Sequence, residues 1–411
     1  MALTYIDIFA GAGGLSEGFL KNGYTPIAHV EMKKEACLTL KTRACYYYLK
    51  SKGRIDEYNQ YLKKNINRDE LYAKVPQELL NTVINKTMDK KSMQELYTQI
   101  DNLMSMQDIQ SVDVLVGGPP CQAYSLVGRA RSKNNMEGDI RNYLYELYSD
   151  MLEKYNPRMF VFENVPGLLT AKKGEYFFNM RERFRQAGYE LDYKILNSKD
   201  FGVLQNRRRV ILIGKRGGQG YHYPLFKRIT ETYSVADLFK DLPPIFPGEQ
   251  KNIYSSDPTE YLKKYNIRTK DDILTWHEAR PNIERDRKIY RCVIKAWDEK
   301  KVRLKYIDLP EELCTHKNRE TFLDRYKVVA SNLEYAQTMV AHISKDGHYF
   351  IHPDINQARS ISVREAARIQ SFPDNFYFEG GRTAAFLQIG NAVPPLMADV
   401  IAAELKQQLM T

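Results

Sequence analysis

The sequence predicts an α/β fold, in which helices cover both faces of a Rossmann-like, mostly parallel sheet, together with a smaller irregular domain. In the first half of the chain, short buried-strand patterns alternate with helical stretches. Beyond Arg216 this alternation gives way to turn signals and irregular polar segments, and a helical pattern resumes near Ser362. A chain of 411 residues is long enough for a large core with an attached domain.

Six short runs rich in β-branched and aromatic residues are the expected strands: Tyr5–Phe9, Pro26–Val30, Asp113–Val116, Arg158–Phe162, Tyr189–Leu196 and Val210–Gly214. Each of the first four is followed by glycines, a carboxylate or a cysteine. Because parallel strands present their carboxyl ends at one edge of a sheet, we expect these residues to share one site.

The domain boundaries follow from changes in this pattern. Residues 1–216 and 356–411 are assigned to the larger domain, and residues 217–355 to the smaller one. Residues 41–107 interrupt the alternation with a Lys- and Tyr-rich stretch of mixed charge. We interpret this stretch as a solvated helical insertion in preference to a dedicated DNA-binding arm.

The composition is that of an ordinary soluble protein, with 43% hydrophobic and 27% charged residues and a mean hydropathy of -0.52. No apolar run reaches the roughly 20 residues that span a bilayer, and no leader pattern opens the chain, so we expect a cytoplasmic protein without membrane contact. The five cysteines are scattered, which predicts neither disulfides nor a metal site. A net charge of +10 fits a polyanionic partner such as nucleic acid, although a merely basic protein is an equally good reading.

A glycine-rich turn follows the first strand, with glycines at positions 11, 13 and 14. Such a turn lets the backbone approach a ligand closely, and Glu31 at the end of the second strand can accept hydrogen bonds from ribose hydroxyls. The pair indicates a nucleoside-containing cofactor. A purely structural glycine turn is the alternative.

Two further strand ends carry reactive groups. Cys121 follows Pro119 and Pro120, and a rigid, exposed turn of this kind suits a nucleophile, although a free cysteine is more often a small buried hydrophobe. Glu163, in the run Glu163-Asn164-Val165, can hold and deliver a proton if it is partly buried.

An arginine cluster occurs in Gln205-Asn206-Arg207-Arg208-Arg209. Alternation along an extended segment would direct Arg207 and Arg209 to one face, where two guanidinium groups can converge on a phosphate or a base carbonyl. A solvated surface cluster is the alternative.

Taken in order, these segments resemble the motifs of the cytosine-5 DNA methyltransferase family. The resemblance covers nearly the whole chain except residues 41–107 and the region of about 217–355. The matching segments are Phe9-Ala10-Gly11-Ala12-Gly13-Gly14, Asp108-Ile109, Pro119-Pro120-Cys121-Gln122, Glu163-Asn164-Val165, Gln205-Asn206-Arg207-Arg208-Arg209, Arg364-Glu365-Ala366-Ala367-Arg368-Ile369-Gln370 and Gly390-Asn391-Ala392-Val393-Pro394.

The resemblance implies a DNA (cytosine-5)-methyltransferase that moves a methyl group from S-adenosylmethionine to carbon 5 of a flipped-out cytosine in a specific double-stranded sequence. Cys121 would attack carbon 6, and Glu163 would bind the ring edge and donate a proton. Arg209 would reach the base O2, with Arg207 on a phosphate or on Glu163. Residues 217–355 would form the target-recognition domain, and a restriction endonuclease acting on the same site is an expected partner of this expected monomer.

The resemblance also implies the binding residues. Glu31 would hold the ribose, Asp108 the adenine amino group, and Met32 would replace a larger aromatic residue found in some relatives. The full cofactor set is Phe9, Ala12, Gly14, Glu31, Met32, Asp108, Ile109, Gly118, Pro120, Leu144, Asn391 and Val393. The expected DNA contacts are Gln122, Ser125 and Arg131, and no metal ligand is expected.

Three other functions are compatible with parts of this pattern. A tRNA cytosine-5 methyltransferase would share the scaffold, but the long irregular region favours a DNA target. A catalytically inactive DNA-binding paralogue would not need Cys121, Glu163 and Arg209. A Rossmann dehydrogenase would explain the glycine turn and leave the Pro-Pro-Cys-Gln run unexplained.

Overall fold

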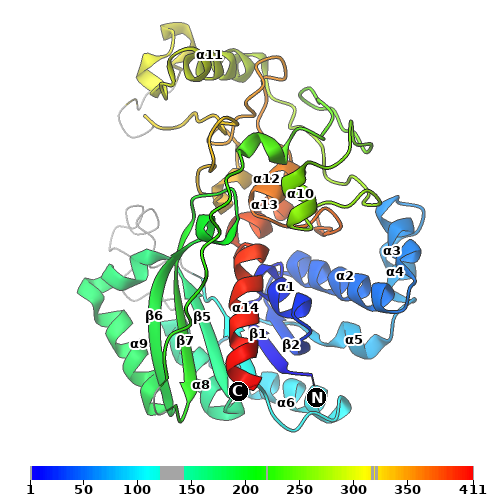
Figure 1. Cartoon of the computed structure of the whole chain (residues 1–411), viewed down its shortest axis with the longest axis vertical. Helices are drawn as coiled ribbons and strands as arrows, with labels where there is room; N and C mark the ends of the chain where they lie inside the picture. Colours follow the sequence, from blue (N-terminus) through cyan, green and yellow to red (C-terminus); the bar gives the residue numbers. More distant parts are fainter. Residues whose placement is uncertain (1, 121–142, 219–220, 316–318, 320–322, 411) are drawn as a thin grey trace.

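A computed structural model describes residues 2–120, 143–218, 221–315, 319 and 323–410. An α/β domain forms the lower part of the molecule, and a smaller, irregular domain that includes α11 forms the upper part (Figure 1). Both termini lie at the far end of the α/β domain, away from the smaller domain (Figure 1).

The described residues form a seven-stranded sheet with the strand order β3-β2-β1-β4-β5-β7-β6. The strands β1 to β5 are parallel to one another, and β7 runs antiparallel to both β5 and β6. The bounds are β1 (Thr4–Ile8), β2 (Thr25–Glu31), β3 (Val83–Asn85), β4 (Val114–Gly117), β5 (Met159–Asn164), β6 (Tyr189–Asn197) and β7 (Arg208–Arg216). All six expected strands are confirmed, and with them the α/β fold.

The register of β1 with its two neighbouring strands shows where the loops after these strands come together. Ile8, the last residue of β1, lies opposite Val30 of β2 and Gly117 of β4. The loops that follow these three strands therefore begin side by side. Because the chain order reverses direction at β1, this edge is the switch point at which α/β sheets bind ligands.

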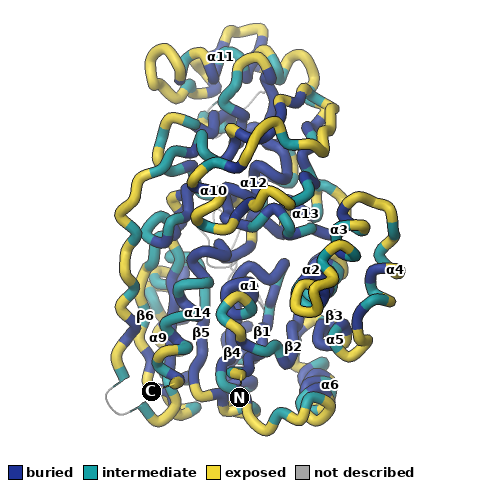
Figure 2. Tube along the Cα trace, turned by 45° about the vertical axis from the view of Figure 1, so that its right-hand side comes forward, coloured by how far each residue is buried: buried dark blue, intermediate teal, exposed yellow. Residues whose placement is uncertain are grey.

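Helices cover both faces of the sheet, as predicted. The helices α1 (Gly14–Lys21) and α14 (Pro395–Met410) pack on the face that carries Tyr5. The helices α6 (Met93–Met106), α8 (Leu144–Tyr155) and α9 (Glu175–Gln186) pack on the face that carries Ile6 and Ile8. The strands β1, β4 and β5 between these helices are almost entirely buried, whereas the edge strand β6 is partly exposed (Figure 2). Among the described residues no single helix meets the length and hydropathy of a membrane span; α13 (Arg382–Asn391) and α14 meet them only together, across a bend of 42°.

The interpretation of residues 41–107 as one insertion is wrong in part. The strand β3 lies inside this range and pairs with β2, so that Glu31 lies opposite Asn85. The helices α2 (Lys34–Ser51) and α6 connect the strands of the sheet. The additional elements are α3 (Ile55–Leu62), α4 (Arg68–Tyr72) and α5 (Gln77–Asn81).

These added helices are solvated only on their outer side. Tyr58, Leu62 and Leu71 are buried in a core that they share with α2. The Tyr61 hydroxyl donates to Glu379 Oε1 at 2.7 Å, and the Arg68 guanidinium lies 3.5 Å from Glu379 Oε2. The added helices therefore brace the segment that leads into α13.

The smaller domain is built from two stretches of sequence. Its core unites residues of 235–274 and 329–350 with α12 (Val363–Ile369) and α13. The expected boundary near residue 356 does not coincide with a break in packing, because α12 and α13 belong to this core and only α14 returns to the sheet. The remaining helices are α10 (Glu260–Lys264), α11 (Glu284–Lys300), and the short 3-10 segments η2 (Pro166–Gly174), η3 (Ser198–Phe201), η4 (Val235–Leu238), η5 (Tyr306–Asp308), η6 (Glu311–Leu313) and η7 (Ala341–Ser344).

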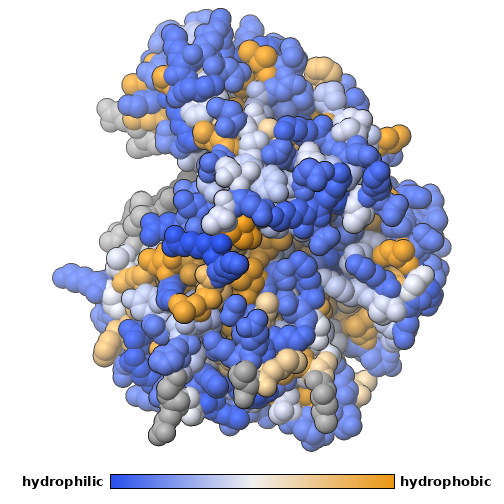
Figure 3. Space-filling view, viewed as in Figure 1, coloured by the Kyte–Doolittle hydropathy of each residue, from blue (hydrophilic) through white to orange (hydrophobic). Residues whose placement is uncertain are grey.

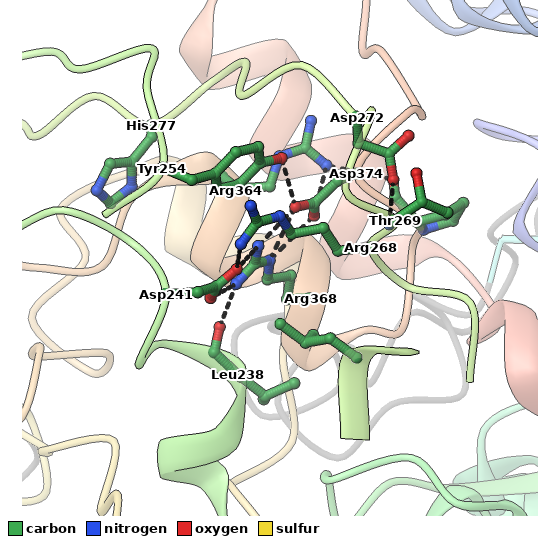
Figure 4. Close-up of polar contacts among 12 residues, drawn as sticks. Leu238, Asp241, Tyr254, Arg268, Thr269, Asp272, His277, Arg364, Arg368 and Asp374 are labelled. Atoms are coloured by element: carbon green, nitrogen blue, oxygen red, sulfur yellow. Dashed lines mark hydrogen bonds and ion pairs between the residues drawn. The ribbon is translucent and has the colours of Figure 1, made fainter. Parts of the chain in front are cut away.

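A buried ionic network joins the two stretches (Figure 4). Arg368 of α12 pairs with Asp241 and with Asp374, each at 2.6 Å. Tyr254 donates its hydroxyl hydrogen to Asp374 at 2.8 Å, and Arg268 pairs with Asp241. Paired and hydrogen-bonded in this way, the charges are tolerated in the core and fix α12 against the chain around residue 241.

Candidate active site

A cleft of about 3210 Å³ separates the carboxyl ends of the strands from the smaller domain. One wall is formed by the loops after β1, β2, β3, β4 and β5. The facing wall is formed by residues 332–342 and 381–393. The surface is indented between the two domains (Figure 3).

The glycine turn after β1 is locked to the end of β2. Gly11 and Gly13 have φ of 56° and 82°, and Gly13 N–H donates to Ala10 O at 2.9 Å. Glu31 Oε2 accepts from Gly11 N–H at 2.9 Å, while Glu31 Oε1 accepts from Lys33 N–H at 2.7 Å. The carboxylate is thus fixed between the two loops, with lone pairs left to accept hydroxyl donors of a ligand.

The C-terminal part of the chain completes this wall. A Cβ on Gly14 would lie 2.3 Å from Val393 O, so the segment around Val393 rests directly on the glycine turn. Asn391 and Val393 consequently line the cleft beside Phe9. Only glycine fits at position 14 without moving this backbone.

Most of the expected cofactor residues lie on the cleft. Those that line it are Phe9, Gly14, Glu31, Met32, Gly118, Pro120, Leu144, Asn391 and Val393. Ala12 is 1% exposed and packs in the core of the smaller domain, so its side chain does not reach the cleft.

The expected place of Asp108 and Ile109 in the cleft is wrong. These residues follow α6 and precede β4, at the amino ends of the strands. In the same connection Ser111 and Asp113 hydrogen-bond Thr4, the first residue of β1. The cleft lies at the opposite edge of the sheet, and neither Asp108 nor Ile109 lines it.

The segment 86–90, which follows β3, takes the expected place of Asp108 and Ile109 in the cleft wall. Asn85 orients this segment by donating its amide hydrogens to Glu31 O and Met32 O, each at 3.0 Å. The β-branched run Thr82-Val83-Ile84 was the available signal in the sequence. It was missed because three residues are too few to show strand alternation.

Sequence reasoning also missed Asp7. This residue of β1 is 1% exposed and lines the cleft, and its Oδ2 has no hydrogen-bond partner among the described residues. Burial and the nearby charge of Glu31 raise the pKa of Asp7 well above its usual value. An acid buried without a partner fits a cationic ligand, because a bound positive charge would offset this penalty.

Glu163 and Arg209 form the second cluster of the cleft. Arg209 Nε lies 2.7 Å from Glu163 Oε1, and both side chains are 12% exposed. A Cβ on Gly118 would lie 2.5 Å from Glu163 Oε2, and Asn164 Nδ2 donates to Pro119 O at 3.2 Å. The carboxylate is therefore held against the Pro-Pro turn. Cys121, Gln122, Ser125 and Arg131 lie outside the described residues.

The expectation that Arg207 shares a face with Arg209 is wrong. The strand β7 begins at Arg208, so strand alternation does not extend to Arg207. Its side chain is fully buried and donates to Gly390 O at 3.1 Å, to Ala392 O at 3.0 Å and to Met339 O. Arg207 is thus turned into the protein and away from a phosphate.

These features define a class of protein. A fixed carboxylate beside a glycine turn suits a nucleoside cofactor, and an acid–arginine pair at the neighbouring strand end suits proton transfer to an anionic or carbonyl-bearing substrate. The described residues contain no group of three or more His, Cys, Asp and Glu side chains able to bind a metal. The fold and the site together indicate an α/β group-transfer enzyme.

Comparisons with known proteins identify the family. The model of the C-5 cytosine-specific DNA methylase family matches residues 3–76 and 77–407. The chain therefore belongs to this family and is a DNA (cytosine-5)-methyltransferase. It is 43% identical to the type II methyltransferase M.Bpa9945I of Bacillus paralicheniformis, over 98% of both chains. It is 30% identical to the type II methyltransferase M1.HphI of Haemophilus parahaemolyticus, over 98% of this chain and 86% of the relative.

Solved structures share the fold. A putative DNA modification methyltransferase encoded within an Escherichia coli prophage superposes with a TM-score of 0.65 at 21% identity, over the full length of both chains. The Entamoeba histolytica methyltransferase EhMeth superposes with a TM-score of 0.54 at 14% identity, over 100% of this chain and 99% of the other.

Proposed function

We propose that this enzyme transfers a methyl group from S-adenosylmethionine to carbon 5 of a flipped-out cytosine in a specific double-stranded DNA sequence. The observation that carries the proposal is the Glu163–Arg209 pair, which lies against the Pro-Pro turn preceding Cys121. Glu163, the proposed acid for the ring edge, and Arg209, the proposed donor to the base carbonyl, thus lie beside the turn that leads to Cys121, the proposed nucleophile.

The cleft fits the proposed cofactor. Glu31 offers carboxylate oxygens to ribose hydroxyls, and Phe9 and Val393 offer apolar contacts nearby. Asp7 offers a buried carboxyl group, whose ionised form would be favoured by the cationic part of the molecule. S-adenosylmethionine supplies the methyl group when it is bound.

The remaining chemistry belongs to the side chains of the chain itself. Cys121 Sγ forms a bond to carbon 6 of cytosine, and Glu163 delivers a proton to ring nitrogen 3, so that carbon 5 becomes electron-rich and accepts the methyl group. Arg209 donates to the base O2 and holds Glu163 in place. A base then removes the carbon 5 proton, the carbon 6–sulfur bond breaks to regenerate the thiolate of Cys121, and ring nitrogen 3 returns its proton to Glu163.

A flipped-out base in double-stranded DNA is the proposed substrate because the ring face of a stacked cytosine is inaccessible to a nucleophile. The wall of the smaller domain offers cationic residues to the phosphates, among them Arg303, Arg325 and Arg382. The names of the two bacterial relatives further support a type II system with a cognate endonuclease. We propose that the enzyme acts as a monomer in the bacterial cytoplasm, where its DNA substrate lies.

The test has two steps. Expression in a host without DNA methylation, followed by mapping of 5-methylcytosine, identifies the target sequence. A duplex with 5-fluorocytosine at that position should then form an adduct with the enzyme that survives denaturing electrophoresis, because fluorine cannot leave as a cation after the methyl transfer.

The adduct should require S-adenosylmethionine, map to Cys121 by peptide mass spectrometry, and be absent from Cys121→Ala. An adduct at another cysteine would overturn the assignment of the nucleophile. Absence of any adduct at a site that the enzyme methylates would overturn the covalent mechanism.

A further inference from the structure

We infer that Arg207, together with Gln205 and Gln370, couples DNA binding to cofactor binding as a set of positioning residues. The inference rests on the proposed function, since it concerns the two ligands proposed for the cleft. It assigns Arg207 a role outside the chemical step, because its fully buried side chain cannot touch a substrate.

The first set of contacts joins residues 204–209, called here the arginine motif, to residues 334–341, called here the recognition segment. This segment lines the cleft from the smaller domain. Ala336 N–H donates to Leu204 O at 2.9 Å, and Asn206 N–H donates to Ala336 O at 3.0 Å. Thr338 Oγ1 donates to Asn206 O at 2.6 Å. The recognition segment is therefore tied to the arginine motif along its length.

At Met339 the recognition segment is held by side chains of the arginine motif instead of by its backbone. Its N–H donates to Gln205 Oε1 at 2.7 Å, and its carbonyl accepts from the guanidinium of Arg207. Both polar backbone groups of Met339 are thus held by buried side chains. A displacement of the recognition segment would pull on Gln205 and Arg207 together.

The second set of contacts joins the same side chains to residues 389–393, called here the cofactor segment. Arg207 donates to Gly390 O at 3.1 Å and to Ala392 O at 3.0 Å. Gln370 Nε2 donates to Ile389 O at 3.1 Å and to Ala392 O at 2.6 Å. Gln205 Nε2 in turn donates to Gln370 Oε1 at 2.5 Å, which closes the network.

The two segments also touch directly. A Cβ on Gly390 would lie 2.4 Å from Ala341 N, so their backbones are in contact. Neither segment can therefore move without disturbing the contact at Gly390 or the hydrogen bonds of Arg207. The cofactor segment presents Asn391 and Val393 to the cleft, and the recognition segment presents Gln337 and Thr338.

The energetics of burial turn this geometry into coupling. All three side chains are 0% exposed, and a planar guanidinium satisfies three carbonyls only in one arrangement. If either segment shifts, buried donors lose their partners without gaining water, which is strongly unfavourable. A ligand that fixes one segment therefore favours the binding-competent position of the other, and the effect must be reciprocal.

The experiment measures the affinity of S-adenosylhomocysteine by titration calorimetry, alone and with saturating duplex that carries the mapped target site. We expect DNA to tighten this affinity by at least about fivefold in the wild type. In Arg207→Lys and in Gln370→Met the ratio should fall below about twofold, while the affinity for each ligand alone changes much less than the ratio. Arg208→Lys, at the neighbouring exposed position, should keep the wild-type ratio.

The outcomes separate the inference from the proposed function. A wild-type ratio near one, or a wild-type ratio retained in both variants, would overturn the coupling. Failure of the wild type to bind either ligand would instead overturn the proposed function. If thermal melting shows that Arg207→Lys does not fold, Gln370→Met and Gln205→Met decide the result, since methionine keeps the shape and removes only the hydrogen bonds.

Discussion

The carboxylate of Glu163 occupies the space in which a side chain at position 118 would lie. A Cβ there would come within 2.5 Å of Glu163 Oε2, and within 3.2 Å of the Glu163 carbonyl. The backbone cannot yield easily because Asn164 holds the same turn through Pro119 O. At the scale of one residue, the position of the proposed catalytic acid thus depends on the absence of a methyl group at position 118.

Gly118→Ala should lower kcat at least about tenfold while leaving the fold intact, because a small misplacement of a proton donor has a large effect on rate. Gly218→Ala, in the turn after β7, serves as the control and should keep the wild-type rate. Methylation kinetics and thermal melting measured on both variants provide the check. A Gly118→Ala enzyme with the wild-type kcat would show that the carboxylate is free to move.

Glu163→Gln should reduce kcat by about 10²–10⁴, since an amide cannot deliver the proton that the carboxylic acid supplies. The affinity for S-adenosylhomocysteine should stay unchanged, because Glu163 is placed at the base and not at the cofactor. Glu190→Gln, on the exposed side of β6, controls for the loss of one negative charge. Equal kcat values for the two variants would remove Glu163 from the reaction.

At the scale of elements, the added helices α3 and α4 act on the smaller domain through one buried carboxylate. Glu379 has a side chain 5% exposed and accepts from Thr42 at 2.5 Å and from Tyr61 at 2.7 Å. Its own N–H donates to Thr39 Oγ1 at 2.8 Å. Three helices therefore converge on the residue that precedes the entry to α13.

Tyr61→Phe should lower the free energy of unfolding by about 1 kcal/mol, the typical value of one hydrogen bond. Glu379→Ala should lower it by about 2 kcal/mol or more, because several buried donors are left without an acceptor. Urea unfolding measures both effects, and Tyr48→Phe on the same helix bundle is the matched control. Equal free energies of unfolding for Tyr61→Phe and Tyr48→Phe would show that the hydrogen bond from Tyr61 to Glu379 does not stabilise the fold.

The same elements show where sequence reasoning succeeds and where it fails. Strands of five or more residues with buried patterns, such as β1 and β2, were found because alternation and flanking turns are local signals. The three-residue strand β3 was not found, and the adenine-contact role was consequently assigned to Asp108 at the wrong edge of the sheet. A short motif such as Asp-Ile carries too little information to fix its own position in the fold.

At the scale of the whole molecule, the packing between segments that are distant in the chain could not be predicted from the sequence. The motifs around Glu31, Glu163 and Arg209 could be placed because each lies at one end of an expected strand. Arg207 could not, because its three carbonyl partners come from residues 339, 390 and 392. The membership of α12 and α13 in the smaller domain likewise depends on long-range contacts that leave no local pattern.

Buried histidines make the stability of the whole fold dependent on pH. His29 accepts or donates hydrogen bonds at Nε2 with Ser16 at 2.6 Å and Tyr5 at 3.1 Å, and burial lowers its pKa to about 4. The unfolded chain takes up this proton at a pKa near 6.5. His29 thus contributes stability in full above about pH 6.5, and up to about 3 kcal/mol is lost as the pH falls to 4. Burial likewise lowers the pKa of His352 to about 3, with the same sign, whereas the raised pKa of Asp7 acts in the opposite direction.

The expected result is a urea midpoint that falls between pH 7 and pH 5 in the wild type and falls less in His29→Gln. His222→Gln, at an exposed position, should retain the wild-type slope. Parallel slopes for the wild type and His29→Gln would contradict the assignment of this acid sensitivity to His29.

The helix α14 and the cofactor segment before it have a consequence for how the enzyme is made. The sheet is laid down by residues 4–216, yet its α1 face is covered, and the glycine turn closed, by residues 389–410. A chain emerging from the ribosome therefore cannot complete its cleft until residues 389–410 have been released. Copies that stop before residue 389 therefore leave the glycine turn open and the α1 face of the sheet uncovered.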